Sequence, residues 1–249
     1  MARSVFITGA SAGIGKGLAL EFASRGYNLA LSARRSGELG LLAAEVERRF
    51  PDVKVACKSL DVNRFDDVYK TVNAFAEEFD GLDIVVANAG TGGGGAVGSG
   101  RFSEDVSVIN TNVLGAMATI DAAVGLFKMQ TSGQVVAISS VAAFRGMPSS
   151  ASYCASKAAI STYMEALEVE LHHSGIKVTT LYPGYIDTAI NQKLKSRPFL
   201  VDVAKGSRIM VDLIEKGVAR STVPVYPWNI VGRLLRFSPV SFLAGKKQA

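Results

Sequence analysis

Cysteine and histidine are scarce in this sequence, with two residues of each among 249. These counts do not suit a disulfide framework. The histidines do not belong to a metal-ligand pattern, so no metal site is expected. Cys57 and Cys154 fall in an expected strand and an expected helix. We therefore expect two buried, reduced thiols and a cytoplasmic protein.

Long uncharged apolar runs are also missing. No apolar run reaches 18 residues without a charge, so no membrane-spanning helix is expected. The N-terminal "MARSVFITGASAG" has too short an apolar run for a signal peptide and enters a motif-bearing strand at once. A hydrophobic content of 48% with no low-complexity run indicates a globular chain, and residues 1–249 suit one domain.

Acidic residues are absent from the C-terminal part of the chain. Six basic residues and no acidic residue follow Glu215, whereas the remainder has 21 basic against 22 acidic residues. The net charge of +5 therefore belongs to this segment, and a nucleic-acid-binding body is not expected.

Strand-like and helix-like patterns alternate through about residue 185. The expected strands are "SVFIT", "NLALSA", "VKVACKSL", "LDIVVANAG", "QVVAISS" and "KVTTLYPG", and helical patterns lie near 37–49, 64–79, 104–129 and 151–173. Because parallel strands need crossover connections, this order predicts an α/β fold, a single doubly wound Rossmann-type domain. Its parallel sheet should have about seven strands with helices on both faces. The glycine-rich run 90–100 is expected to be a flexible loop at a strand's carboxyl end, where ligands bind.

The first strand runs into the turn "TGASAGIG", in which Gly9, Gly13 and Gly15 have the spacing GxxxGxG. Small residues let the backbone approach a pyrophosphate, and the next helix presents N–H groups and a positive dipole end to it. The turn therefore predicts a dinucleotide site, although tight packing of strand against helix would also demand glycine.

The second strand ends at two arginines, with no acid before Glu38. An acid at this place in dinucleotide-binding folds binds the ribose 2′-hydroxyl, whereas the planar guanidinium of arginine suits a phosphate. Arg34 and Arg35 therefore predict a 2′-phosphate and NADP(H) as the cofactor. Two solvated surface arginines are the alternative.

Polar residues also end the third and fourth strands. Asp61 in "SLDV" is placed to reach an adenine amino group, and Asn88 in "ANAG" to brace neighbouring strands. Asp and Asn are favoured at strand ends in any case, so local turn chemistry explains either one equally well.

In "SYCASK", Tyr153 and Lys157 lie four residues apart on an expected helix and therefore on one face of it. The phenol and the ammonium could cooperate in proton transfer. The same spacing also arises by chance, so the pair needs support from other motifs.

That support comes from the order of motifs. The chain has "TGASAGIG", "ANAG", Asn112 in "NTNVLG", Ser140 in "ISS", "YCASK" and "PG" at 183–184. In this it resembles the short-chain dehydrogenase/reductase family, in the type of about 250 residues, over residues 4–188. The glycine-rich loop is lengthened and the tail after 190 diverges, which is where the family sets its substrates.

The resemblance implies a role for each of four residues. Tyr153 donates a proton to a carbonyl or accepts one from an alcohol, and Lys157 lowers the pKa of that phenol and holds the nicotinamide ribose. Ser140 binds the substrate oxygen, while Ser139 points to the opposite face of the strand. Asn112 distorts the long helix locally and holds a water that relays protons to Lys157.

The resemblance also implies the residues around the cofactor, a carbonyl or alcohol as substrate, and a homodimer or homotetramer. The expected cofactor-binding residues are Gly9, Ser11, Gly13, Ile14, Gly15, Arg34, Arg35, Asp61, Val62, Asn88, Ala89, Gly90, Tyr153, Lys157, Pro183, Gly184, Ile186 and Thr188.

Two segments after the last motif have their own predicted roles. Residues 185–205 should form a mobile substrate lid, and a moderately apolar ketone or aldehyde is the expected substrate. The tail 226–249 combines Trp228 and other apolar residues at helical spacing with basic residues, which suits peripheral contact with a membrane surface. Docking against the sheet or another subunit is the plainer explanation of the same pattern.

The expected activity is NADP(H)-dependent interconversion of a carbonyl and a secondary alcohol. A nucleotide-sensing binding protein and a sugar-nucleotide epimerase or dehydratase are the alternatives. Intact Ser140, Tyr153 and Lys157 disfavour the first, and the second needs a larger substrate domain than this chain offers.

Overall fold

The computed structural model describes residues 2–192, 194 and 196–243. Seven parallel strands form one sheet in the order β3-β2-β1-β4-β5-β6-β7. The strands are β1 (Ser4–Thr8), β2 (Asn28–Ala33), β3 (Val55–Ser59), β4 (Ile84–Ala87), β5 (Gly133–Ile138), β6 (Ile176–Pro183) and β7 (Arg220–Val223). The predicted doubly wound fold is confirmed, and the order reverses direction between β1 and β4, where such sheets bind ligands.

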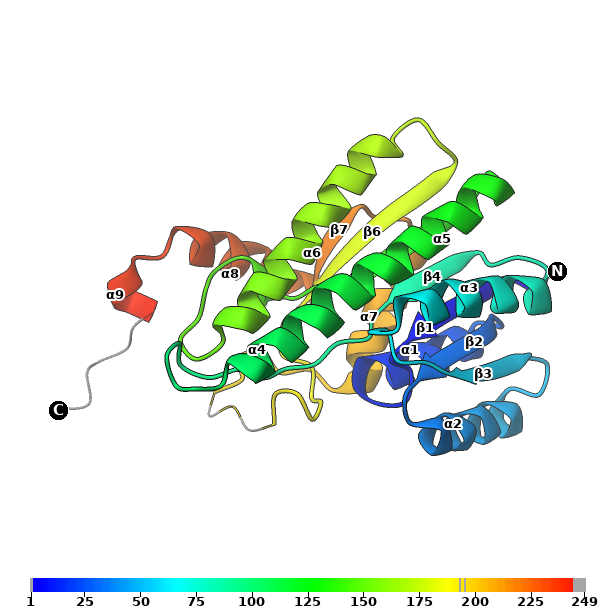
Figure 1. Ribbon diagram of the computed structural model, residues 1–249, viewed down its shortest axis with the longest axis horizontal. Helices are drawn as coiled ribbons and strands as arrows, with labels where there is room; N and C mark the ends of the chain where they lie inside the picture. The colour runs from blue at the N-terminus through cyan, green and yellow to red at the C-terminus, as the bar shows by residue number, and fades with distance from the viewer. Residues whose placement is uncertain (1, 193, 195, 244–249) are drawn as a thin grey trace.

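Helices cover both faces of the sheet (Figure 1). One face carries α1 (Gly13–Ser24), α2 (Ser36–Arg49) and α7 (Val203–Glu215), and the other carries α3 (Phe65–Phe79), α5 (Ala116–Gln130) and α6 (Ala151–Glu170). Three shorter or peripheral helices are α4 (Phe102–Ile109), α8 (Val225–Phe237) and α9 (Val240–Leu243). The four helices predicted from periodicity correspond to α2, α3, the run of α4 and α5, and α6.

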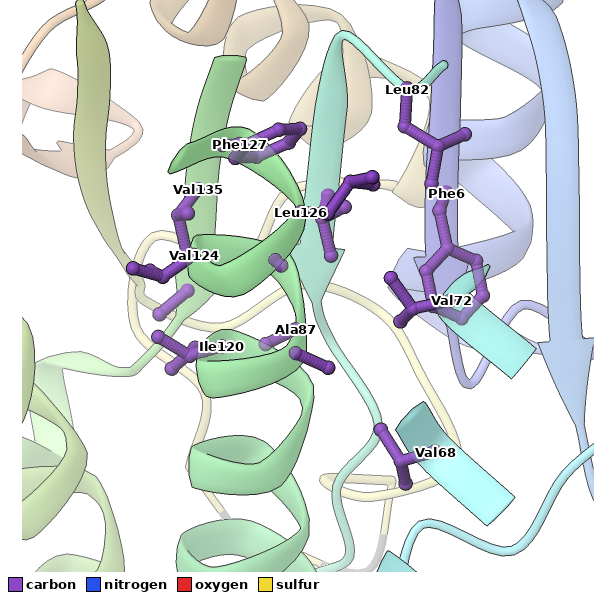
Figure 2. Packing of buried hydrophobic residues seen from close by; sticks show 14 of the residues in the cluster. Phe6, Val68, Val72, Leu82, Ala87, Ile120, Val124, Leu126, Phe127 and Val135 are labelled. Carbon is purple, nitrogen blue, oxygen red and sulfur yellow. The ribbon is translucent and has the colours of Figure 1, made fainter. Parts of the chain in front are cut away.

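The strands divide their side chains between two cores. Phe6 points into the core beneath α3 and α5, whereas its neighbours Val5 and Ile7 point into the core beneath α1 and α7. Figure 2 shows the first of these cores, in which Val72 lies beside Phe6 and residues of α5 pack toward β4 and β5. The central strands β1, β4 and β5 are mostly buried and apolar, as parallel sheets require, whereas the edge strands β3 and β7 also contain Lys58 and Arg220.

The helix run Phe102–Gln130 is long and apolar enough to cross a membrane by length and composition alone. However, 56% of its most apolar window is buried inside the fold, where α5 packs on α3, β4 and β5. We therefore interpret it as a core helix. A π-helical turn interrupts it at Asn110–Gly115, the local distortion that was expected around Asn112.

Two expectations from the sequence are wrong, and one predicted segment ends in a helix. Cys57 is exposed rather than buried, because β3 is an edge strand, although Cys154 is buried as expected. The last residues of the predicted lid 185–205 belong to α7, whose first turn is capped by the Asp202 carboxylate accepting from the Lys205 N–H. Trp228, counted among the tail residues that suit membrane contact, is buried, since only 3% of it is exposed.

Candidate active site

A cavity of about 360 Å³ lies at the carboxyl ends of the strands. Every residue predicted to bind the cofactor lines it, and so does Ser140. Residues that the sequence analysis did not single out also line it, namely Ala12, Ala33, Leu60, Thr91, Thr111, Ile138, Ser139, Ala189, Ile190 and Asn191. Most of these are sequence neighbours of predicted residues, which is the one signal that could have found them.

The glycine turn forms the floor of the cavity. Gly9 and Gly13 have φ angles of 69° and 54°, which strain any residue with a side chain. A Cβ on Gly9 would lie 2.8 Å from the Ala89 Cα, and one on Gly15 would clash with the Gly9 carbonyl oxygen. Tight packing therefore accounts for part of this motif.

The N-terminus of α1 gives a second reason for the glycine motif. Its N-cap is Ala12, no side chain caps the helix, and its first turn contains no acid. Backbone N–H groups and the positive end of the helix dipole are therefore available to an anion in the cavity, as a pyrophosphate requires.

The two arginines stand at the rim beside this turn. Both are exposed, and the Arg35 guanidinium donates to the Ser11 hydroxyl at 3.0 Å. Ser11 is itself buried in the glycine turn, so the guanidinium is held at the cavity wall. A cationic, bidentate donor therefore lies where β2 ends, with the donor geometry that a phosphate needs.

Asp61 and Asn88 combine structural contacts with a place in the cavity wall. The Asp61 carboxylate accepts from the Asn63 N–H at 3.0 Å, which is the turn chemistry given as the alternative. The Asn88 amide donates to the Thr8 carbonyl at 2.8 Å, so it braces β4 against β1 as predicted.

Asn112 lies behind the cavity in the π-helical turn. It is buried, its side-chain oxygen accepts from the Thr91 N–H at 2.7 Å, and its amide donates to the Thr91 carbonyl at 2.9 Å and the Ser156 hydroxyl at 3.2 Å. These bonds fix the start of the glycine-rich loop against α6. Asn112 is thus a bracing residue that does not itself line the cavity.

Lys157 brings a buried ammonium to the opposite end of the cavity from the arginines. Its Nζ donates to the Ile138 carbonyl at 2.9 Å and lies 5.8 Å from the centre of the Tyr153 ring. Burial lowers the pKa of this lysine to about 8. An ammonium has three N–H donors, so two remain for groups within the cavity that Lys157 lines.

Tyr153 lines the cavity and is half-buried in its wall. Burial raises the pKa of Tyr153, and hydrogen bonding with Ser140 offsets only part of that rise. We expected Lys157 to lower the pKa of Tyr153. Instead the pKa is raised, because the cost of desolvating the phenolate exceeds the stabilisation that neighbouring groups of the protein provide. At neutral pH the phenol therefore holds its proton.

The two serines after β5 face different ways, as predicted. The Ser140 hydroxyl accepts from the Ala142 N–H at 3.1 Å and lies 3.4 Å from the Pro183 carbonyl oxygen, on the Tyr153 side. The Ser139 hydroxyl lies 3.0 Å from the Lys157 carbonyl and 2.8 Å from the Ser161 hydroxyl. Ser139 therefore positions α6, while Ser140 remains for the cavity.

The segment after β6 forms the remaining wall. A bridge joins Ile186 to Val201, and the Asn191 amide donates to the Ile186 carbonyl at 2.6 Å. Arg197 pairs with Asp187 at 2.6 Å. Lys193 and Lys195, counted in the predicted lid, lie outside the described residues.

Trp228 ties the C-terminal helix to this wall. Its indole lies so close to Gly184 that a Cβ there would clash with Nε1, and its ring centre is 6.0 Å from Tyr185 and 5.7 Å from Phe199. The inner side of α8 is therefore docked against the fold. The sequence could not show this contact, because it joins residues more than 25 positions apart.

Comparison with known proteins agrees with this arrangement. The model of the short chain dehydrogenase family matches residues 3–198. An uncharacterized oxidoreductase of Mycobacterium tuberculosis is 40% identical over 238 residues, covering 95% of this chain and 94% of that protein. An uncharacterized oxidoreductase of Myxococcus xanthus is 37% identical over 230 residues, covering 92% and 88%.

Among solved structures, the alcohol dehydrogenase of Thermococcus sibiricus complexed with 5-hydroxy-NADP superposes with a TM-score of 0.81. It is 27% identical, and the match covers 90% of this chain and 95% of that one. The chain belongs to the short-chain dehydrogenase family of oxidoreductases.

Proposed function

From this family membership, we propose that the protein is an NADP(H)-dependent oxidoreductase that interconverts a carbonyl and a secondary alcohol. The observation that carries the proposal is the arrangement of one cavity. Ser140, Tyr153 and Lys157 meet at one end of it, and Arg34 and Arg35 stand at the other beside the glycine turn.

The raised pKa of Tyr153 suits it to act as a proton donor at neutral pH, the role that carbonyl reduction requires. The nicotinamide supplies the hydride when bound. Tyr153, whose raised pKa keeps it protonated, donates its proton to the carbonyl oxygen, and Ser140 holds that oxygen by a hydrogen bond. The Lys157 ammonium lies close enough to stabilise the phenolate that remains.

The arginines support the preference for NADP(H). The first strand-to-helix turn holds the pyrophosphate, and Arg34 and Arg35 then lie where a 2′-phosphate would follow. The T. sibiricus enzyme, whose fold superposes over most of both chains, was solved with an NADP derivative.

The remaining inferences concern the setting of the enzyme. We infer a moderately apolar ketone or aldehyde as substrate, because Ile190 lines the same cavity as Tyr153. We infer a lid motion of residues 185–205 and a homodimer or homotetramer from the family resemblance, and a cytoplasmic location from the two free cysteines.

The test is NADPH consumption with a panel of ketones and aldehydes, run beside Tyr153→Phe. The substitution should reduce turnover by about 10³-fold, within the range for loss of a general acid, and leave NADPH binding nearly unchanged. Unchanged turnover in the variant would refute the mechanism.

The same assay separates the alternatives. NADPH binding without turnover of any carbonyl would indicate a nucleotide-sensing protein. Conversion of a sugar nucleotide without net NADPH oxidation would indicate an epimerase or dehydratase. Equal efficiency with NADH and NADPH would contradict the cofactor assignment.

A further inference from the structure

Helix α8 carries apolar side chains on its solvent side. Tyr226, where the helix is kinked and the backbone is not helical, is followed by Ile230, Leu234 and Phe237 at helical spacings of four and three; we name these four exposed residues the outer face of α8. Their exposed fractions are 73%, 51%, 64% and 82%. Val240 in α9 is also exposed.

The opposite side of the same helix is already occupied. Trp228 is buried over Gly184, and Gly232 lies so close to Phe144 that a Cβ would clash with its ring. In Figure 1, α8 and α9 extend outward from the body, at the end of the molecule opposite the N-terminus. The outer face therefore points away from the fold.

A helix packed on one side should have a polar outer side, and this one does not. Exposed apolar stripes of this kind mark interaction surfaces. The outer face of α8 therefore needs a partner whose surface is apolar.

Charge identifies that partner. The segment 225–249 contains Arg233, Arg236, Lys246 and Lys247 and no acidic residue. In a symmetric pair of chains the same surface meets itself, so a second copy would bring two basic segments together. Anionic lipid headgroups would attract these residues, while the acyl region accepts the apolar side chains.

We propose that the outer face of α8 lies on the surface of an anionic membrane. The contact rests on α8 and its charge and is independent of the proposed activity.

The experiment is co-sedimentation of the full chain with vesicles of phosphatidylcholine alone and with added phosphatidylglycerol. Leu234→Glu combined with Phe237→Glu removes two residues of the outer face. Met129→Glu combined with Val169→Glu is the matched control, because those residues are 75% and 78% exposed on α5 and α6. Truncation after residue 227 is unsuitable, since it removes Trp228 from its packed site.

The wild-type chain should bind the anionic vesicles, bind neutral vesicles more weakly, and lose affinity as salt screens the headgroups. The outer-face variant should bind at least tenfold more weakly, and the control should match the wild type. Thermal melts should show that both variants are folded, because all four residues are exposed.

Absence of binding by the wild-type chain would overturn the proposal. Equal loss of binding in both variants would do the same, because it would indicate a general charge effect. Light scattering provides the third criterion: dissociation of an oligomer by the outer-face variant, without an effect on vesicle binding, would show that a second copy covers α8.

Discussion

The two ends of the cavity hold positive charge in different ways. At the nucleotide end, Arg34 and Arg35 are exposed, so water solvates their charge and a phosphate can take its place. At the catalytic end, Lys157 is buried and its pKa falls to about 8. The first end is built to bind, whereas the second retains a charge at an energetic cost so that it can act on a proton.

The largest expected effect comes from removing the buried ammonium of Lys157, which tests what that charge costs in folding stability. Lys157→Met should abolish turnover yet make the protein more stable at pH 7, by about 3 kcal/mol, because the buried ammonium is gone. Between about pH 8 and 10.5 the native wild-type lysine is neutral while the unfolded one still binds a proton, so wild-type stability rises with pH relative to the variant. The advantage of the variant should therefore shrink over this window.

Urea unfolding followed by fluorescence of Trp228, the single tryptophan, measures this difference. Comparison with the variant at each pH removes the opposite contribution of groups such as Tyr153, whose raised pKa lowers stability above about pH 10. A difference that stays constant with pH would show that charge burial is not its cause.

The next effect tests whether the nucleotide end depends on close backbone approach. Gly15→Ala should destabilise the protein by about 1–3 kcal/mol, since the new Cβ meets the Gly9 carbonyl oxygen. Gly40→Ala, in α2 with nothing within 4 Å, should instead stabilise it by about 0.5–1 kcal/mol. Melting temperatures measure both, and equal shifts in the two variants would contradict the packing argument.

The smallest expected effect is a change in cofactor affinity alone. Arg35→Ala should weaken NADPH binding by about tenfold, or ~1.4 kcal/mol, because a charge-assisted hydrogen bond to phosphate is lost. NADH binding should be unchanged, and Arg48→Ala, which alters an exposed arginine near the C-terminal end of α2, should affect neither cofactor. Equal weakening toward NADH and NADPH would show that Arg35 does not contact a 2′-phosphate.

Prediction from the sequence succeeds where local rules act. The alternation of strands and helices follows from side-chain periodicity, and the glycine turn follows from backbone angles that other residues avoid. Every predicted cofactor-binding residue lines one cavity, because the carboxyl ends of parallel strands meet at one edge. The short strand β7, by contrast, has no pattern that marks it.

The misjudged residues depend on which elements pack together. Cys57 is exposed because β3 lies at the sheet edge, and Trp228 is buried because α8 returns to Gly184. The direction of the Tyr153 pKa likewise depends on how closely protein surrounds the phenol. None of these quantities is a property of a residue and its near neighbours in sequence.

For this protein the sequence by itself determined the family pattern, the parallel α/β architecture and the pairing of Tyr153 with Lys157, since each rests on local spacing. Only the tertiary structure decided the protonation of that pair, the bracing role of Asn112 and the two unlike sides of α8. The physical reason is that desolvation and surface exposure are set by contacts between distant segments.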